Sequence, residues 1–295
     1  MITQTSYKDR PAICFHSGPA AVLFLPEDGG KMASFQYRDR EYLAQAPGTT
    51  YLRLGPESDY VACECSGFDD MFPTIDPFAL DPTSDASAMA ADHGEVCRHP
   101  METRIEGDCV VLQFSSPTLP VRFRKAIRCA AQGGGVELDY EIANESERFV
   151  PCLWAAHCML RAEKGARIIH PYAEDASIRT MFGRQLSRTE TLPFSMAGES
   201  YKYYFRAPAP QGYAGYRYRD GRTFMLRYPP EVVPYLGVWI NNGSFKGMYN
   251  IALEPCTAPY DRPDAAQAAS VPSALRPGET IRFRVSVTVE EAQEV

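Results

Sequence analysis

Strict alternation of apolar and polar residues marks several segments of the chain. The alternation covers residues 136–142 and residues 281–289, and residues 121–124 give a shorter example. A period of two, with β-branched and aromatic residues on one side, is typical of antiparallel strands that bury one face. Turn-forming residues separate these segments from their neighbours, as in the three glycines at 133–135. The pattern therefore predicts an antiparallel β-sheet protein.

Helical patterns are scarce in this sequence. The chain contains 24 prolines and 21 glycines, and only residues 260–270, with an early proline and a run of alanines, predict a short helix. Residues 76–92 are polar and without period, which indicates a long ordered loop of the kind that often carries function. A length of 295 residues allows two domains, but no composition break or repeat divides the chain. We therefore predict an all-β fold that forms a single domain over residues 1–295.

Composition narrows the partners and the compartment. The formal net charge is −7, which disfavours nucleic-acid binding because contact with phosphates requires clustered lysine and arginine. No apolar run approaches the roughly 18–20 residues of a transmembrane helix, and residues 1–11 lack the apolar core of a signal peptide. We expect a cytoplasmic protein, a monomer or homodimer, that binds neither nucleic acid nor membrane.

The nine cysteines predict no special chemistry. None belongs to a Cys-x-x-Cys pair, and Cys63 and Cys65 are too close together for a common zinc knuckle. Buried reduced thiols are the favoured interpretation, with a disulfide framework or a structural zinc as the alternative. We expect no metal and no cofactor, because the sequence contains no nucleotide-binding, metalloprotease or serine-hydrolase motif.

Three polar residues are candidates for chemistry. His157 lies in the apolar sequence 153–159, where it is either a functional imidazole or a core histidine bonded to backbone. His93 follows the long loop and is either a ligand contact or a loop cap. Glu254 ends the apolar sequence 249–255 and is either an exposed edge residue or a carboxylate held against a pocket. Partial burial raises the pKa of a carboxylate towards that of a general base at neutral pH.

Trp239 and Asn241 lie just upstream of Glu254, in the sequence 237–243. An aromatic ring can stack on the C–H face of a sugar while neighbouring amides bond its hydroxyls, so the pair suits a carbohydrate site. The alternative is that Trp239 belongs to the hydrophobic core.

Several segments, in the right order over most of the chain, resemble the galactose mutarotase-like family, the aldose 1-epimerases and their relatives. Residues 138–146, followed by Trp154-Ala155-Ala156-His157, form the most specific segment, which looks like the family's strand, asparagine-containing turn and second active-site histidine. The other similar segments are residues 29–35 and 40–43 (opening hairpin), 68–75 and 92–95 (first active-site histidine), 252–255 and 263–265 (catalytic glutamate), and 275–280 (entry to the last strand).

This resemblance implies an antiparallel β-supersandwich with a monosaccharide site on the concave face of a sheet. It further implies that Glu254 is the general base, that His157 is the general acid, and that His93 bonds the ring-oxygen region of the sugar. Arg98 is a further candidate for substrate binding. The family's substrate-holding arginine and aspartate have no unambiguous match in this sequence; Arg98 is either a substrate ligand or a surface residue, and Asp175 and Asp220 are both candidates for the aspartate.

Two alternatives within the same fold remain open. The family usually has a Pro-Tyr-Phe-like sequence after the second histidine, whereas residues 158–160 here are Cys-Met-Leu, which favours a sugar-binding or sensing protein without catalysis. The other alternative is a hexose 6-phosphate 1-epimerase, which requires a cationic cluster at the pocket rim. Candidates for that cluster are Arg122, Arg124, Lys125 and Arg128. A purely structural or protein-interaction role is the least favoured function.

Overall fold

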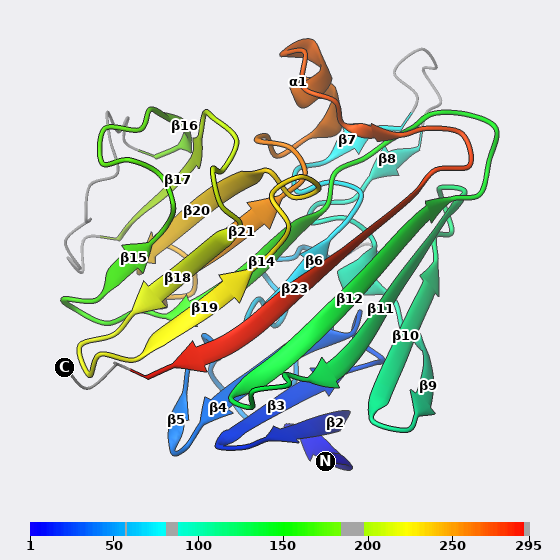
Figure 1. The fold of residues 1–295 in the computed structure, drawn as a ribbon. Coiled ribbons are helices and arrows are strands. Elements are labelled where there is room, and N and C mark those ends of the chain that lie inside the picture. The colour runs from blue at the N-terminus through cyan, green and yellow to red at the C-terminus, as the bar shows by residue number, and fades with distance from the viewer. Residues whose placement is uncertain (57, 81–87, 184–197, 292–295) are drawn as a thin grey trace.

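Two large antiparallel sheets pack face to face in the computed structural model, which describes residues 1–56, 58–80, 88–183 and 198–291 (Figure 1). In Figure 1 the smaller sheet, which contains β12 and β23, lies in front of the larger one. The two sheets share one hydrophobic core. The prediction of an all-β, antiparallel protein is therefore confirmed.

The larger sheet contains the strands that carry the candidate site. Their order across the sheet is β1 (Ile2–Tyr7), β2 (Arg10–Ser17), β3 (Ala20–Leu25), β4 (Lys31–Tyr37), β6 (Phe68–Met71), β14 (Ala155–Arg161), β21 (Tyr249–Cys256), β20 (Tyr235–Asn242), β17 (Glu199–Phe205) and β16 (Ile178–Phe182), with β5 (Arg40–Glu41) paired to β4.

The smaller sheet covers the opposite side of the core. Its order is β15 (Arg167–Ile169), β18 (Tyr213–Arg217), β19 (Thr223–Arg227), β23 (Thr280–Glu290), β12 (Gly135–Asn144), β11 (Val121–Cys129), β10 (Cys109–Ser115) and β9 (Glu102–Glu106). The remaining described elements are the pairs β13 (Val150–Pro151) with β22 (Ala274–Leu275) and β7 (Phe78–Ala79) with β8 (Met89–Ala90), the 3₁₀ helix η1 (Val96–Arg98) and the helix α1 (Pro263–Ala268).

The alternating segments of the sequence form the strands they predict. Residues 136–142, 281–289 and 121–124 lie within β12, β23 and β11, and the helix predicted within 260–270 is α1. The expected long loop at 76–92 is structured at both of its described ends, because β7 and β8 pair with each other. Residues 81–87 of that segment lie outside the described residues.

Aromatic side chains join the two sheets across the core. Phe35 on β4 meets Phe224 on β19 edge-on, with ring centroids 5.2 Å apart. Trp154, just before β14, packs against Phe283 of β23 at 4.7 Å. Full burial of a side chain of this size contributes about 1.5–3 kcal/mol, so these contacts fix the spacing of the sheets. Six of the nine cysteines are also buried, and all nine are free thiols.

Strand alternation decides which residues reach the candidate site. On β14, Ala156, Cys158 and Leu160 point into the core shared with the smaller sheet, whereas His157 faces the other way. On β21, Leu253 points into that core and Glu254 faces away from it. Successive side chains of a strand point to opposite faces, so the outer face of the larger sheet gathers the odd residues of β14 and the even residues of β17 and β21.

Among the described residues, no helix reaches the length and apolarity required to cross a membrane.

Candidate active site

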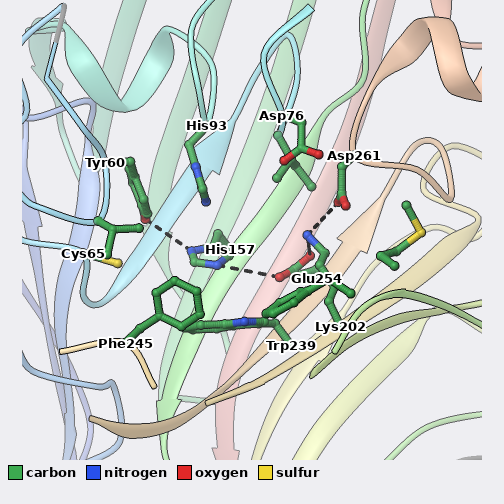
Figure 2. Close-up of a pocket in the computed structure, with 14 residues that line it drawn as sticks. Tyr60, Cys65, Asp76, His93, His157, Lys202, Trp239, Phe245, Glu254 and Asp261 are labelled. Carbon is green, nitrogen blue, oxygen red and sulfur yellow. Dashed lines mark hydrogen bonds and ion pairs between the residues drawn. The ribbon is translucent and has the colours of Figure 1, made fainter. Parts of the chain in front are cut away.

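A cavity of about 340 Å³ lies on the outer face of the larger sheet (Figure 2). This volume falls within the range of small-molecule sites, roughly 300–1,000 Å³. The titratable residues of its lining are Tyr60, Cys65, Asp76, His93, His157, Lys202, Glu254 and Asp261, and its aromatic walls include Trp239, Phe182 and Phe245. The predicted site residues His93, His157, Trp239 and Glu254 therefore meet in one pocket.

Glu254 lies at the base of the cavity and is completely buried. The ammonium Nζ of Lys202 lies 2.8 Å from Glu254 Oε2 and 2.7 Å from Asp261 Oδ1, so one cation bridges two carboxylates. The hydroxyl of Tyr204 donates to the same Asp261 oxygen at 2.8 Å. Burial raises the pKa of Glu254, and the adjacent ammonium of Lys202 opposes that rise. Burial would lower the pKa of Lys202, but the two carboxylates outweigh it and raise that pKa.

Backbone geometry leaves room for this cluster. Gly237 on β20 is the register partner of both Glu254 on β21 and Tyr204 on β17. A Cβ atom at position 237 would lie 2.7 Å from the Tyr204 ring and 3.2 Å from Glu254 Oε2. The glycine therefore provides the space in which the carboxylate meets its cation. Asp261 is fixed from the other side, since its carbonyl oxygen accepts hydrogen bonds from the backbone N–H groups of Ile75 and Asp76, each at 2.9 Å.

His157 lies beside Glu254, with Nε2 at 3.7 Å from Oε1 (Figure 2). On the other side of its ring, the Tyr60 hydroxyl lies 3.3 Å from Nδ1 and donates to Asp69 Oδ2 at 2.8 Å. Since that hydroxyl has one proton, its oxygen accepts from Nδ1–H of His157. A neutral His157 therefore presents the lone pair of Nε2 to Glu254. Lys31 holds Asp69 in place with a 2.6 Å ion pair.

Burial dominates the protonation of His157. The imidazole is almost fully buried, and burial together with the positive charges around it lowers its pKa well below the ordinary value of 6.5. Charged groups are disfavoured in low-dielectric surroundings unless a partner compensates. In the unliganded cavity, His157 is therefore neutral at pH 7. Lys202 lies 2.8 Å from Glu254 Oε2, whereas Oε1 has no hydrogen-bond donor among the described residues, so Oε1 is available to a ligand hydroxyl.

His93 reaches the cavity from the loop after β8. Its backbone has φ of 60°, and its ring stacks on Tyr60 at 3.8 Å between centroids and 7° between planes. The same ring meets His157 edge-on at 5.3 Å. The following Gly94 has φ of 73°, and a Cβ there would lie 2.2 Å from the carbonyl oxygen of Phe72. The tight approach of this loop to the end of β6 brings His93 over the site.

Trp239 forms one wall of the cavity. Its ring centroid lies 5.8 Å from that of His157 and 5.5 Å from that of Phe245. It belongs to the outer face of β20, not to the core between the two sheets. An apolar plane beside a carboxylate and an imidazole is the arrangement expected of a site for a molecule with one apolar and one hydroxylated edge.

Other residues singled out from the sequence lie outside the cavity lining. Arg98 is buried under the loops, where its guanidinium donates to the carbonyl oxygens of residues 55, 56, 58, 92 and 94 and so satisfies backbone groups that would otherwise be unpaired. Asn241 bonds Asn250 Oδ1 and the backbone of Phe245, which shapes the turn after β20. Asp220 pairs with Arg40 and Arg222, and Asp175 lies exposed in the loop before β16.

Sequence reasoning did not identify Lys202, Asp261 or Tyr60. One signal for Lys202 exists, because it is a lone cation in the aromatic sequence 201–205 of a strand. A charged residue between buried aromatics on a β-strand requires a buried partner. Tyr60 and Asp261 lie in loops on either side of the site, and no periodicity marks them.

Comparisons with known proteins identify the fold. No protein-family model and no curated protein sequence matches the chain. Among solved structures, the Slr1438 protein from Synechocystis sp. PCC 6803 is 18% identical and matches with a TM-score of 0.71, covering 98% of this chain and 99% of that chain. A galactose mutarotase-like protein from Clostridium acetobutylicum is 14% identical with a TM-score of 0.65, covering 99% of this chain and 98% of that one.

A third solved structure, the galactose mutarotase related enzyme from Lactobacillus acidophilus, is 15% identical with a TM-score of 0.61, covering 96% of this chain and 99% of that one. At these identities the likeness concerns the fold, and it extends over nearly the whole length of each chain. The fold class expected from the sequence is confirmed: the chain has an antiparallel, galactose mutarotase-like fold.

Proposed function

We propose that the protein is an aldose 1-epimerase-like enzyme, which interconverts the α and β anomers of a monosaccharide. The observation that carries this proposal is the pairing of Glu254 and His157 at 3.7 Å in a cavity with an aromatic wall. One group accepts protons and the other delivers them, and both are buried where water competes poorly. The mutarotase-like fold of the solved neighbours supports the same reaction class.

The proposed reaction opens and recloses the cyclic hemiacetal. Glu254 removes the proton of the C1 hydroxyl, the bond between C1 and the ring oxygen breaks, and His157, protonated on Nε2, gives its proton to the ring oxygen. Rotation about C1–C2 turns the other face of the aldehyde towards the hydroxyl. On reclosure His157 takes back the proton of the attacking hydroxyl and Glu254 gives its proton to the C1 oxygen, so both side chains return to their starting forms and no cofactor is consumed. Such positioned proton transfers accelerate reactions by about 10²–10⁴-fold each.

Substrate position follows from the walls of the cavity. Trp239 provides an apolar plane on which a sugar ring can stack, and Glu254 and His157 lie at one edge of it. His93, over the same pair, is within reach of the ring-oxygen region of the sugar in this pose. Arg98 and Asn241 act indirectly in this proposal, through the loops that they hold.

The cavity favours an unphosphorylated sugar. Arg122, Arg124, Lys125 and Arg128, the candidates for a phosphate-binding cluster, lie on β11 of the smaller sheet. Three of them already pair with carboxylates outside the cavity lining, Arg122 with Glu141, Lys125 with Asp70 and Arg128 with Asp139. Within the described lining, the one lysine or arginine is Lys202, which two carboxylates already neutralise.

Polarimetry tests this proposal. Freshly dissolved α-D-glucose, α-D-galactose and a panel of other aldoses are expected to reach anomeric equilibrium faster with the protein than in buffer alone. Glucose 6-phosphate, followed in parallel, is expected to be a poor substrate. If no aldose is accelerated but sugars quench Trp239 fluorescence saturably, the protein is a sugar-binding module and the proposed reaction is wrong. Trp239→Phe identifies the fluorescence of that residue, because Trp154 is buried in the core.

The reaction is also expected to slow as the pH rises. Its active form has His157 protonated and Glu254 ionised, and burial lowers the pKa of His157 below 6.5. Where Glu254 is ionised, the protonated imidazole is lost as the pH rises above that lowered pKa, and kcat/KM should fall by about tenfold per unit. Polarimetry over about pH 5–8.5, corrected for buffer catalysis, measures this limb. A rate constant that does not change between about pH 6 and 8 contradicts His157 as the acid.

A further inference from the structure

Lys202 lies in a buried position, where a charged side chain costs free energy because it loses its hydration. Its side chain is 9% exposed, and the alternate residues of β17 on either side, Tyr201 and Tyr203, point into the core of the sandwich. On the site face its neighbours are the Tyr204 ring and its register partner Trp239. A buried ammonium persists in such surroundings only when opposite charges compensate its lost hydration. Lys202 has two such charges, Glu254 and Asp261.

The same cost of burying a charge applies to Glu254, whose charge is negative. A carboxylate at 0% exposure would take up a proton rather than remain charged without a partner. A protonated carboxyl group cannot remove a proton from a sugar hydroxyl. Glu254 can therefore act as a base only if a cation beside it keeps the carboxylate ionised. Among the described residues, Lys202 provides this cation, at 2.8 Å from Oε2.

We propose that Lys202 is a positioning residue that holds Glu254 in its anionic, base-competent form, and that Asp261 limits this effect by sharing the same ammonium. In this role Lys202 stays protonated and exchanges no proton with the sugar. It acts through Glu254: its ammonium lies 2.8 Å from Glu254 Oε2, where it orients the carboxylate and balances its charge (Figure 2). The inference rests on the proposed function for its kinetic consequences, although the charge balance itself does not.

Several elements besides β17 present titratable groups to Glu254, and each of them affects its charge. His157 of β14 and His93 of the loop after β8 lie on one side of the carboxylate. Asp261, in the loop after β21, lies on the other side and disfavours a second negative charge. The remaining groups are Tyr204, which donates to Asp261, and the thiol of Cys256 on the same strand. Lys202 differs from all of these groups, because it forms a close ion pair with Glu254 and carries a positive charge throughout the neutral pH range.

Two substitutions with opposite expected effects test the proposal. Lys202→Met removes the positive charge, so the limb of the kcat/KM profile on which Glu254 ionises and the rate increases with pH should move to higher pH by about one unit or more. Asp261→Asn removes the competing carboxylate but keeps an acceptor for Tyr204, so the same limb should move to lower pH. Lys202→Arg restores a cation and should return the profile towards that of the wild type. Lys125→Met is the matched control, because it removes another buried, carboxylate-paired lysine that lies outside the cavity lining.

If Lys202 only stabilises the folded structure, a different result is expected. Lys202→Met would then lower the rate and the melting temperature, as is expected of Lys125→Met, without moving the pH profile. Equal profiles for the Lys202→Met, Asp261→Asn and wild-type proteins overturn the inference. Asp261→Asn tests the inference even if Lys202→Met fails to fold, since Lys202 keeps Glu254 as its ion-pair partner in that variant.

A second readout needs no activity. In Lys202→Met the buried Glu254 has lost its cation, so its folded-state pKa rises further above its unfolded value. Stability from such a group is present at low pH and is lost as the pH rises through the folded pKa. The melting temperature of Lys202→Met, relative to wild type, should therefore fall between about pH 5 and 8, and adding Glu254→Gln should remove this dependence. If the dependence is absent, the inference fails; if it is present while no aldose is epimerised, the proposed function fails and the inference stands.

Discussion

Glu254→Gln is expected to lower kcat for anomer interconversion by roughly 10²–10⁴-fold, the loss typical of a removed general base. Glutamine has nearly the same shape as glutamate but cannot accept a proton from a C1 hydroxyl. The substitution also removes one of the two carboxylates that pair with Lys202, yet the ammonium keeps Asp261 at 2.7 Å. No unpaired buried charge results, so the folded structure and the sugar-binding wall at Trp239 should persist.

The measurement compares polarimetric rates of the wild-type and Glu254→Gln proteins at saturating sugar. Melting temperature and quenching of Trp239 fluorescence by the sugar establish that the variant folds and binds. Glu147→Gln, on the exposed loop after β12, is the matched control and should keep the wild-type rate. A Glu254→Gln protein that binds sugar and turns it over at a near-normal rate would show that Glu254 is not the base.

The central strands of the smaller sheet were predictable because their two faces differ strongly in burial. In β12 and β23, one face is buried between the sheets and the other is solvated, and alternation of apolar and polar residues records that difference directly. The strands of the site, β14 and β21, are covered on both faces and read as continuous apolar runs. In such a run a single polar residue is conspicuous, which is why His157 and Glu254 were identified from sequence.

The partners of those two residues were not predictable, because they depend on register between strands and on loops. Lys202 reaches Glu254 across β20, where Gly237 opposes both strands. Tyr60 reaches His157 from a loop that precedes β6. Neither relation leaves a trace in local sequence, since a one-residue change of register would turn the same side chains to the other face. Arg98 shows the reverse case, a cation near His93 in the sequence whose guanidinium is occupied by five backbone carbonyls.

His157→Asn is expected to lower kcat by a similar factor, roughly 10²–10⁴-fold, for the complementary reason. The asparagine amide does not become a proton donor of suitable acidity at the ring oxygen. Tyr60 keeps its 2.8 Å hydrogen bond to Asp69, so the wall behind the imidazole should remain ordered and sugar binding should change little. His16→Asn, which replaces an exposed histidine on β2 bonded to Thr3, is the matched control.

The double variant decides whether the two residues act as one unit. If Glu254 and His157 move protons in the same step, removing both should cost little more than removing either one, because the remaining partner has no productive role alone. Two independent roles would instead make the losses multiply. Rates of the two single variants and the double variant, with sugar binding measured by Trp239 fluorescence in each, separate these outcomes. Multiplying losses would mean that the 3.7 Å approach of His157 to Glu254 does not reflect a shared catalytic step.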